Sequence, residues 1–278
     1  MGSTVLYVKW LTIKIAGWLF TAVTVVLVFF SWEDIGMTNT CEKISVIFGI
    51  PILSLLTAIV TTVLCKKKTN WRRGKASINL QYGDLIKVGF SKKSGRRIIV
   101  ISVNTHFDTI VSDKLIAESS IHGQWINEFC KNNETQSSLN NRIQVAIKEQ
   151  KIQPLRENQS KAGNKTAYPR GSIVMLKQGD TLFFLLALSE FDEDQNAQCN
   201  REQLLDNIRG LVDFYDKNGQ GYPIYIPLLG TELSRVNITE QESLQLLTDM
   251  LRLYREKLHG EVNIVVYKKH RSQVPIFN

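Results

Sequence analysis

Two long apolar runs occupy the first quarter of the chain, and neither contains a charged residue. They extend from Ile15 to Trp32 and from Ile44 to Cys65. At about 18 and about 22 residues, they match the roughly 20 that a membrane-spanning helix needs. A short acidic connection, Glu33 to Lys43, joins them. The pattern predicts a hairpin of two transmembrane helices.

A cleaved signal peptide is the other interpretation of the first run, because Lys9 and Lys14 precede it as a basic n-region would. Bulky Trp32 and acidic Glu33 follow the run, however, where a signal peptide has small residues. We therefore expect the first run to persist as a membrane helix.

Beyond residue 75, short runs rich in branched residues alternate with amphipathic helical patterns, as is typical of an α/β domain. Helical faces run from Leu204 to Tyr215 and from Leu244 to Leu258. Thr239 and Glu242 have the spacing of a capping box. The predicted strands are Ile98 to Val103, Ile173 to Leu176, Leu182 to Leu188, Pro223 to Leu228 and Val262 to Tyr267, with an earlier strand and turn within Ile78 to Val88.

The last predicted helix joins the last two strands, so a right-handed crossover between parallel strands is expected. Polar segments from Asn158 to Tyr168 and from Asp192 to Arg201 are predicted to be surface loops. The chain is thus expected to have two parts. Residues 1–75 form a transmembrane helical hairpin with a basic juxtamembrane linker, and residues 76–278 form one soluble domain with a mixed sheet flanked by helices.

The distribution of charge supports this division. Of the formal net charge of +8, residues 1–75 carry nine basic and three acidic side chains, a net +6. Lys9 and Lys14 precede the first helix, and a basic cluster from Lys66 to Lys75 follows the second. This predicts a two-pass protein of the cell (inner) membrane, with both termini and the soluble domain in the cytoplasm. Because the excess charge lies beside the apolar helices, a nucleic-acid partner is not expected.

Small hydroxyl residues recur at helical spacing in the second apolar run, at Ser54, Thr57 and Thr61. They either hydrogen-bond between helices or only bond their own backbone. Neither run contains an ionisable residue, so neither resembles the substrate path of a transporter.

The sequence gives no sign of a metal site. The cysteines and histidines show no paired or metal-ligand spacing, and a reduced compartment is the simplest expectation. They are Cys41, Cys65, Cys130, Cys199, His106, His122, His259 and His270.

The loop that follows the strand at Pro223 is a candidate anion site, because anionic ligands bind where a parallel strand ends and a helix begins. Gly230 lets a phosphate approach the backbone, while Thr231, Ser234 and Arg235 can supply donors. A plain turn that uses Gly for its geometry is the alternative.

Four short motifs each follow a strand of the soluble domain. They are Tyr82-Gly83-Asp84-Leu85, Val103-Asn104-Thr105, Ser119-Ser120-Ile121-His122-Gly123 and Pro227-Leu228-Leu229-Gly230-Thr231-Glu232. In order and spacing over residues 78–267, they resemble the motifs of the macro domain, a family of α/β modules that bind ADP-ribose and related nucleotides. The resemblance implies a macro-domain-like nucleotide-binding domain over residues 76–278.

The resemblance also implies a role for each motif. Asp84 corresponds to the carboxylate that accepts a hydrogen bond from the adenine amino group, and Asn104 to the residue beside the distal ribose. The implied ligand contacts around the phosphates come from a first loop and a closing loop. Their residues are Ser119, Ser120, Ile121, His122 and Gly123, and then Leu229, Gly230, Thr231, Glu232 and Ser234.

With its two amino-terminal helices, the chain resembles the membrane-anchored macro-domain effectors of type II Thoeris antiphage defence systems. The resemblance implies that an ADP-ribose derivative, histidine-ADP-ribose, made by a partner TIR-domain enzyme, is the activating signal. It further implies assembly of a homo-oligomer in the membrane and disruption of that membrane, which is antiviral defence by abortive infection.

Two departures from the family affect the expected activity. The first loop has no carboxylate after Glu118, where hydrolytic macro domains have an acidic residue, and Glu232 stands in place of the second glycine of the closing loop. A ligand-binding effector without catalytic residues is therefore favoured.

Two alternatives remain. One is a membrane-tethered ADP-ribosyl hydrolase that uses Asn104 and a water activated by Asp108 or Glu118, although both carboxylates are expected to be solvated surface groups. The other is an anchored scaffold whose soluble domain binds only protein.

Overall fold

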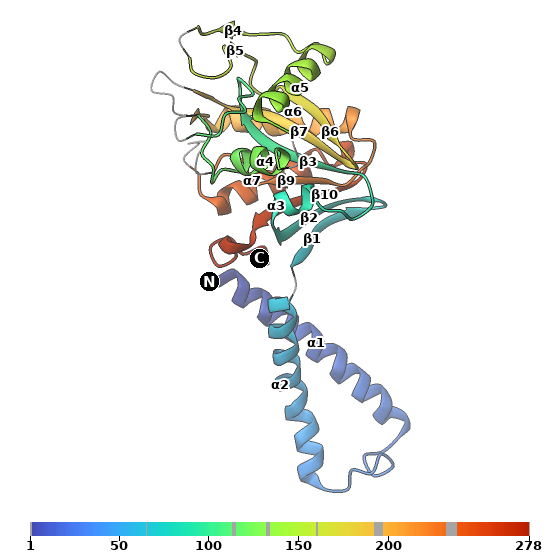
Figure 1. The fold of residues 1–278 in the computed structure, drawn as a ribbon. Helices are drawn as coiled ribbons and strands as arrows, with labels where there is room; N and C mark the ends of the chain where they lie inside the picture. The colour runs from blue at the N-terminus through green and yellow to red at the C-terminus, as the bar shows by residue number, and fades with distance from the viewer. Residues whose placement is uncertain are drawn as a thin grey trace. The chain divides into compact units, whose positions relative to one another are not determined.

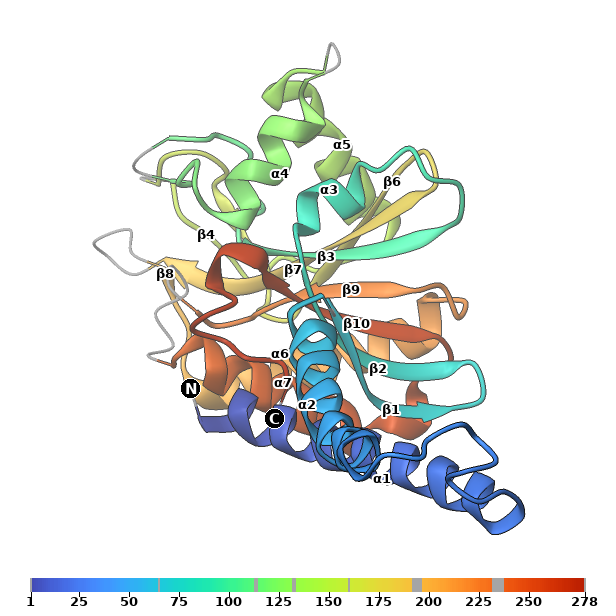
Figure 2. The same ribbon diagram turned by 90° about the horizontal axis from the view of Figure 1, so that it is seen from below.

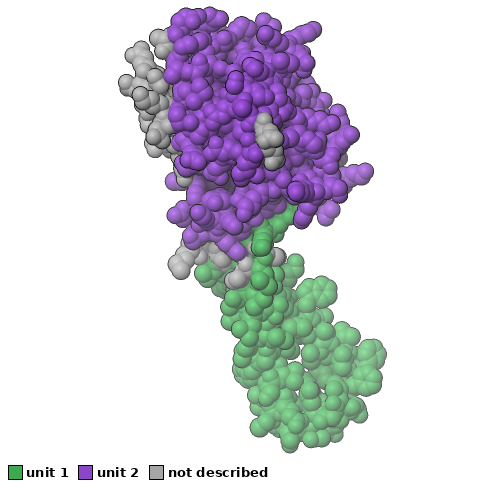
Figure 3. Space-filling view, in the orientation of Figure 1, with its two compact units in different colours: residues 1–68, 275–278 green, residues 69–274 purple. Residues whose placement is uncertain are grey.

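The computed structural model describes residues 2–64, 66–112, 115–131, 134–159, 161–191, 197–231 and 238–277. The chain divides into two compact units (Figure 3). The first comprises Met1–Lys68 together with Pro275–Asn278, and the second is Thr69–Val274.

The first unit contains two long helices, α1 (Gly2–Phe29) and α2 (Thr40–Leu64). The segments Tyr7–Phe29 and Thr40–Thr62 are each long and apolar enough to cross a membrane, judged by length and composition, with mean hydropathies of 2.0 and 2.3. Both helices coincide with the predicted apolar runs, although α1 begins well before its run. They contact each other directly.

The hydroxyl residues of α2 do not form one interhelical stripe. Ser54 is buried, whereas Thr57 and Thr61 are exposed. Each hydroxyl donates to a carbonyl four residues earlier, at 2.7 Å. The second of the two sequence interpretations, hydrogen bonding to the helix's own backbone, is therefore the one that the structure shows.

The second unit is built on a mixed sheet with the strand order β1-β2-β10-β9-β3-β7-β6, and β8 pairs with β7. Strands β2, β10, β9, β3 and β7 run parallel, while β6 and β8 are antiparallel to β7. The bounds are β1 Lys67–Arg73, β2 Ala76–Gly83, β3 Arg97–Asn104, β6 Ile173–Gln178, β7 Thr181–Phe191, β8 Ala197–Gln198, β9 Ile224–Pro227 and β10 Glu261–Tyr267; a separate hairpin pairs β4 Arg156–Glu157 with β5 Thr166–Ala167.

Helices cover both faces of this sheet, in three layers (Figures 1 and 2). Helices α3 (Leu85–Gly89), α4 (Ile121–Phe129) and α5 (Gln136–Glu149) lie on one face. On the other face lie α6 (Arg201–Asn218) and α7 (Glu240–Leu253). A sheet buried on both faces needs apolar side chains on both, which explains the unbroken apolar runs of the parallel strands.

Aromatic side chains fill the layer between the sheet and α4. The rings of Trp125 and Phe129 lie 5.2 Å apart, and Phe183 of β7 lies 5.7 and 6.0 Å from them. All three side chains are fully buried. On the opposite face, Phe184 meets Phe214 of α6 edge to face at 5.1 Å. Alternation along β7 therefore anchors both helical layers.

The structure confirms the predicted strands from Ile98 onward, the helix over Leu204 to Tyr215 and the parallel pairing of the last two strands. The last predicted helix is confirmed from Leu244, but α7 ends at Leu253, and Leu258 lies beyond it in an extended conformation. The capping box of Thr239 and Glu242 is present at the start of α7. The earlier strand predicted within Ile78 to Val88 is confirmed as β2, which ends at Gly83 where the turn was expected. The residues after the turn form the short helix α3, which was not predicted. The basic segment after α2 forms β1.

Side chains of α5 and of Gln150, the residue that ends this helix, cover the outer edge of β6. An unpaired edge strand would otherwise invite association with other chains. The Gln150 side chain pairs with both backbone groups of Met175: Oε1 accepts from its N–H at 3.1 Å, and Nε2 donates to its carbonyl at 3.3 Å. Arg142 donates to the next outward carbonyl, that of Lys177, at 3.0 Å. The amide of Gln150 thus takes the place of a neighbouring strand.

We predict that Gln150→Ala lowers the free energy of unfolding by about 1 to 2 kcal/mol, because two hydrogen bonds to the Met175 backbone are lost. Urea denaturation of the fragment Thr69–Val274 measures this change. The control is Gln153→Ala, since Gln153 is exposed and is expected to stay within about 0.5 kcal/mol of the parent. Equal effects of the two substitutions would show that Gln150 does not secure this edge.

Candidate functional site

The parallel strands bring three of the sequence motifs to one edge of the sheet. Strands β2, β9 and β3 end at Gly83, Pro227 and Asn104. Only β10 lies between β2 and β9, and β3 is the next neighbour of β9. In open sheets, ligands bind beyond the carboxyl ends of parallel strands. The motifs that contain Asp84, Asn104 and Gly230 therefore meet where such a site is expected.

Asp84 begins α3 as its N-cap. Its Oδ1 accepts a hydrogen bond from the Lys87 backbone N–H at 3.2 Å, and its backbone is extended, with φ −124° and ψ 108°. The side chain is half-buried. Since a carboxylate has two acceptor oxygens, capping by Oδ1 leaves acceptor capacity at Oδ2.

Asn104 shapes the loop that follows β3. It is buried, and its Oδ1 accepts from the backbone N–H groups of His106 at 3.0 Å and Asp108 at 3.3 Å. Inside this tight loop, Phe107 has a positive φ of 51°, which is unusual for a bulky residue. Because Oδ1 is occupied by the loop, the Nδ2 group is the part of Asn104 that can serve a ligand.

A second segment, residues 161–164, holds the same loop from outside. Asn164 Nδ2 donates to the carbonyls of His106 and Phe107, both at 3.0 Å. Lys161 Nζ lies 2.7 Å from Asp108 Oδ2, and the two side chains are only 5% and 1% exposed. The Asn164 N–H donates to Asp108 Oδ1 at 2.7 Å. The loop after β3 is therefore fixed before any ligand arrives.

Gly163 makes this close approach possible. Its φ is +79°, and a Cβ built on it would lie 2.4 Å from Asp108 Oδ1. Any side chain there would collide with the buried carboxylate, in a backbone conformation that already favours glycine.

Two predictions about this region are wrong. Asp108 is not a solvated surface carboxylate, because Lys161 and Asn164 enclose it. The segment from Asn158 to Tyr168 is not simply a surface loop, since Lys161, Ala167 and Tyr168 are buried. An ion pair between residues so far apart in the chain leaves no local pattern in the sequence. Glu118, by contrast, is exposed as expected.

Both histidines near the site are neutral at physiological pH. Burial, with the positive charge of Lys161 as a second cause, lowers the pKa of His106 to about 4. Burial lowers the pKa of His122 to about 3. Neither imidazole therefore supplies positive charge to an anionic ligand. Within the described ranges, no three His, Cys, Asp or Glu side chains gather as a metal site requires.

The segment from Ser119 to Gly123 forms the start of α4. Ser120 is the N-cap, and its Oγ accepts from the Gly123 N–H at 2.9 Å. The Ile121 side chain packs against the core, and His122 is buried beside the Trp125 ring. Their side chains thus belong to the protein interior. What this segment offers a ligand is the backbone N–H groups of the first helical turn, which have no carbonyl partner within the helix.

Gly123 is required by packing within the chain. A Cβ at this position would lie 2.3 Å from the Ala117 carbonyl oxygen and 3.0 Å from Glu118 Cα. The glycine therefore lets residues 117 and 118 fold back against α4. The family resemblance had implied a ligand contact at this glycine.

The closing loop is described as far as Thr231. Leu229 is buried, and its carbonyl accepts from Ser243 Oγ of α7 at 2.7 Å. Gly230 has a φ of +80°, so its backbone conformation favours glycine. Thr231 is half-buried. Glu232 and Ser234 lie outside the described residues, as does Arg235.

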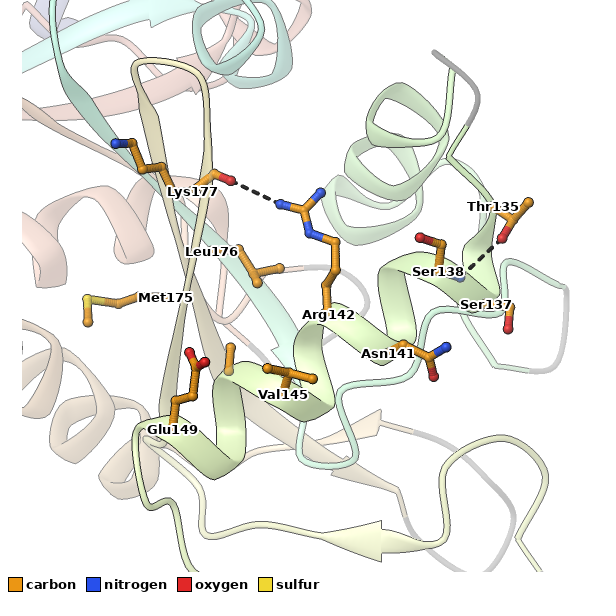
Figure 4. A pocket seen from close by; sticks show the side chains of 11 residues that line it. Thr135, Ser137, Ser138, Asn141, Arg142, Val145, Glu149, Met175, Leu176 and Lys177 are labelled. Atoms are coloured by element: carbon orange, nitrogen blue, oxygen red, sulfur yellow. Dashed lines mark hydrogen bonds between the residues drawn. The ribbon is translucent and has the colours of Figure 1, made fainter.

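A pocket of about 750 Å³ lies away from these motifs, between α5 and β6. Figure 4 shows Arg142, Asn141 and Val145 on the α5 side, with Lys177 and Met175 on the strand side. The hydrogen bond from Arg142 to the Lys177 carbonyl crosses it. Sequence analysis did not point to this groove, and none of the predicted site residues lines it.

Comparison with known proteins gave three kinds of match. Residues 78–267 match the family described as "Thoeris protein ThsA, Macro domain". The Thoeris protein ThsA of Bacillus amyloliquefaciens (strain Y2) is 22% identical over 262 residues, which cover 92% of this chain and 84% of that protein. A solved structure of an Oceanobacillus iheyensis macrodomain with ADP is 13% identical and has a TM-score of 0.47. The match covers 74% of this chain and 91% of the macrodomain chain. A mutant of that macrodomain with ADPR is 12% identical and has a TM-score of 0.44. This match covers 74% of this chain and 93% of the mutant chain.

We predict that Lys161→Met lowers the free energy of unfolding by about 3 kcal/mol, because it leaves the buried Asp108 carboxylate without its cation. Urea denaturation of Thr69–Val274 again provides the measurement. Lys165→Met is the matched control, since Lys165 is exposed and a change within about 0.5 kcal/mol is expected.

A second variant tests the physical cause of that loss. In the double variant Lys161→Met with Asp108→Asn, the buried charge is gone while an acceptor for the Asn164 N–H remains. Most of the lost stability should return. A double variant no more stable than Lys161→Met alone would mean that the ion pair is not what holds this loop.

Proposed function

The chain belongs to the Thoeris ThsA macro-domain family, and from this we propose that its soluble domain binds an ADP-ribose-derived nucleotide at the carboxyl edge of the sheet. The observation that carries the proposal is that Asp84, Asn104 and Gly230 follow the ends of β2, β3 and β9 at one edge of the sheet, and that α4 contacts β3 and α3 beside them. A nucleotide with a diphosphate between two riboses has groups suited to each of them.

The chemistry of each group fits one part of such a ligand. The free oxygen of Asp84 accepts from the adenine amino group, and Asn104 Nδ2 donates to a hydroxyl of the distal ribose. The amides of the first α4 turn and the backbone around Gly230 receive the diphosphate, because helix N-termini and glycine loops attract anions. Ser119, Thr231 and Ser234 are proposed as further donors around the phosphates, whereas the Ser120 hydroxyl already donates to the Ala117 carbonyl.

We infer that the domain senses its ligand without hydrolysing it. Hydrolysis needs a base close to the attacking water. Asp108 is engaged by Lys161 and Asn164, and Glu118 is exposed and accepts from Asn127 at 3.3 Å. Neither carboxylate is thus placed as a free base beside Asn104, which favours a binding role over the hydrolase alternative.

In the proposed mechanism, histidine-ADP-ribose from a partner TIR-domain enzyme is the signal, and an assembly of the membrane hairpins is the response. The ligand acts by preferring the assembled state, and a preference of a few kcal/mol is enough to shift the population. Because the spanning segments of α1 and α2 are apolar, disruption of the membrane by clustered helices is a more natural outcome than a selective channel. The result is antiphage defence by abortive infection.

We predict that Asp84→Ala weakens binding of ADP-ribose by about 1.5 to 3 kcal/mol, through loss of a hydrogen bond to a charged acceptor. Isothermal titration with the soluble domain measures the change. Asp84→Ser separates this role from helix capping, because Ser also caps helices but does not reach as far. Both variants should bind weakly, and Asp84→Ser should keep the parent's stability. Parent-like affinity in either folded variant would remove Asp84 from the site.

The proposed topology has its own test at Cys41, an exposed free cysteine near the start of α2. A membrane-impermeant thiol reagent added outside intact cells should label Cys41 in a variant whose other cysteines are alanine. A cysteine introduced at Asn39 should behave in the same way, and one at Asn278 should stay unlabelled until the cells are opened. Labelling of position 278 from outside would reverse the orientation.

A further inference from the structure

The carboxy-terminal segment begins between the two halves of the candidate site. It follows β10, which pairs with β2 on one side and β9 on the other. In this register Tyr267 lies opposite Gly83, and Val265 lies opposite Pro227. The segment Lys268–Phe277, called here the tail, therefore leaves the sheet between the Asp84 turn and the Gly230 loop.

One contact ties the tail to the Asp84 side of the site. The Tyr82 hydroxyl donates to the Val274 carbonyl at 3.0 Å. The Arg271 guanidinium lies over the Tyr82 ring, 4.9 Å from its centroid. Tyr82 is buried and stands two residues before Asp84. A shift of the Asp84 turn therefore moves a residue that holds the tail.

A second contact ties the tail to the Gly230 side. His270 Nδ1 pairs with Oε1 of Glu240, the first residue of α7. Ser243, in the same helical turn, donates to the Leu229 carbonyl at 2.7 Å. The other carboxylate oxygen of Glu240 is buried and has no hydrogen-bond partner among the residues described. His270 is thus a direct partner of this carboxylate, and α7 links the loop to the tail.

The end of the tail belongs to the membrane unit. Residues Pro275–Asn278 group with α1 and α2. The ring of Phe277 lies 4.9 Å from that of Tyr7 in α1, with 33° between the ring planes. Ile276 and Phe277 are 1% and 4% exposed. Aromatic pairs at this separation attract each other beyond their apolar burial.

We propose that the tail relays ligand binding from the macro domain to the membrane hairpin, through Tyr82 and Glu240 at its start and Tyr7 at its end. The inference rests on the proposed function and adds to it a route for regulation. The chain also joins its two units directly between Lys68 and Thr69, but that junction lies within β1, an edge strand of the sheet. Only the tail starts beside the candidate site.

The relay works by linkage. A bound nucleotide contacts the Asp84 turn and the Gly230 loop and shifts their positions. The contacts that Tyr82 and α7 make with the tail therefore differ in strength between the free and bound states. A ligand changes a distant equilibrium only through such a difference. If the resting hairpin opposes the bound state, cutting the tail contact leaves nucleotide binding as tight as before or tighter.

A fluorescent dye on Cys41 reports on the hairpin without presupposing membrane damage. The full-length chain, with Cys65, Cys130 and Cys199 replaced by alanine, is labelled and placed in lipid vesicles. ADP-ribose and histidine-ADP-ribose are titrated in turn, and both binding and the change in dye signal are recorded. The variants are Tyr7→Ala, Phe277→Ala and the two combined. Ile13→Ala is the control, because Ile13 of α1 is 63% exposed.

Each single variant is expected to bind the nucleotide as tightly as the parent or more tightly, and to reduce the dye response by at least about fivefold, the low end of common coupling strengths. The double variant should do no worse than either single variant, because both remove the same contact. Ile13→Ala should respond as the parent does. His270→Ala should also lose the dye response. Because this substitution lies outside α1, it tests the relay even if the α1 variants fail to insert into the membrane.

The remaining outcomes separate the relay from the proposed function. A parent chain that binds neither nucleotide overturns the proposed function, and the relay falls with it. A parent that binds without any dye response overturns the relay alone. So does a parent-like response in Phe277→Ala or His270→Ala.

Discussion

The parallel pairing of β10 with β2 on one side and β9 on the other is the interaction on which the rest of the structure depends. It aligns Gly83 and Pro227 at one edge of the sheet, with Tyr267 between them. A parallel register fixes where every connecting loop begins. The turn at Asp84, the loop at Gly230 and the carboxy-terminal tail are neighbours for this reason. A buried amide ladder, in which Asn79 donates to Asn263 at 3.3 Å, adds specificity to the pairing.

The candidate site is held by polar groups that already have partners. Asp84 caps α3, Asn104 fastens its own loop, and Ser120 caps α4. Under the proposed function, each also offers one group to the ligand: a carboxylate oxygen, an amide nitrogen, or a helix start. Such pre-organisation lowers the entropy lost on binding, since the loops are ordered beforehand. The buried ion pair of Asp108 with Lys161 orders the loop after β3 in the same way.

Local patterns predicted the elements that depend on local chemistry. The α7 start followed from Thr239 and Glu242, and the strands from runs of branched residues. Helix α5 was missed although Leu139, Ile143 and Ala146 recur on one face. Strand β1 has no apolar pattern, and only its pairing with β2 makes it a strand. Two contacts join distant parts of the chain, one between Asp108 and Lys161 and one between Tyr82 and Val274. Sequence spacing cannot predict contacts of this kind.

The most direct test of the central claim is hydrogen–deuterium exchange of the full-length chain with and without ADP-ribose or histidine-ADP-ribose. Binding at the carboxyl edge of the sheet predicts slower exchange in residues 84–89, 104–108, 120–124 and 229–231. Exchange in α5 and β6, which form the separate groove, should not change. Two results would contradict the account. One is slower exchange confined to residues 136–149 and 173–178, and the other is no change in exchange on addition of either nucleotide.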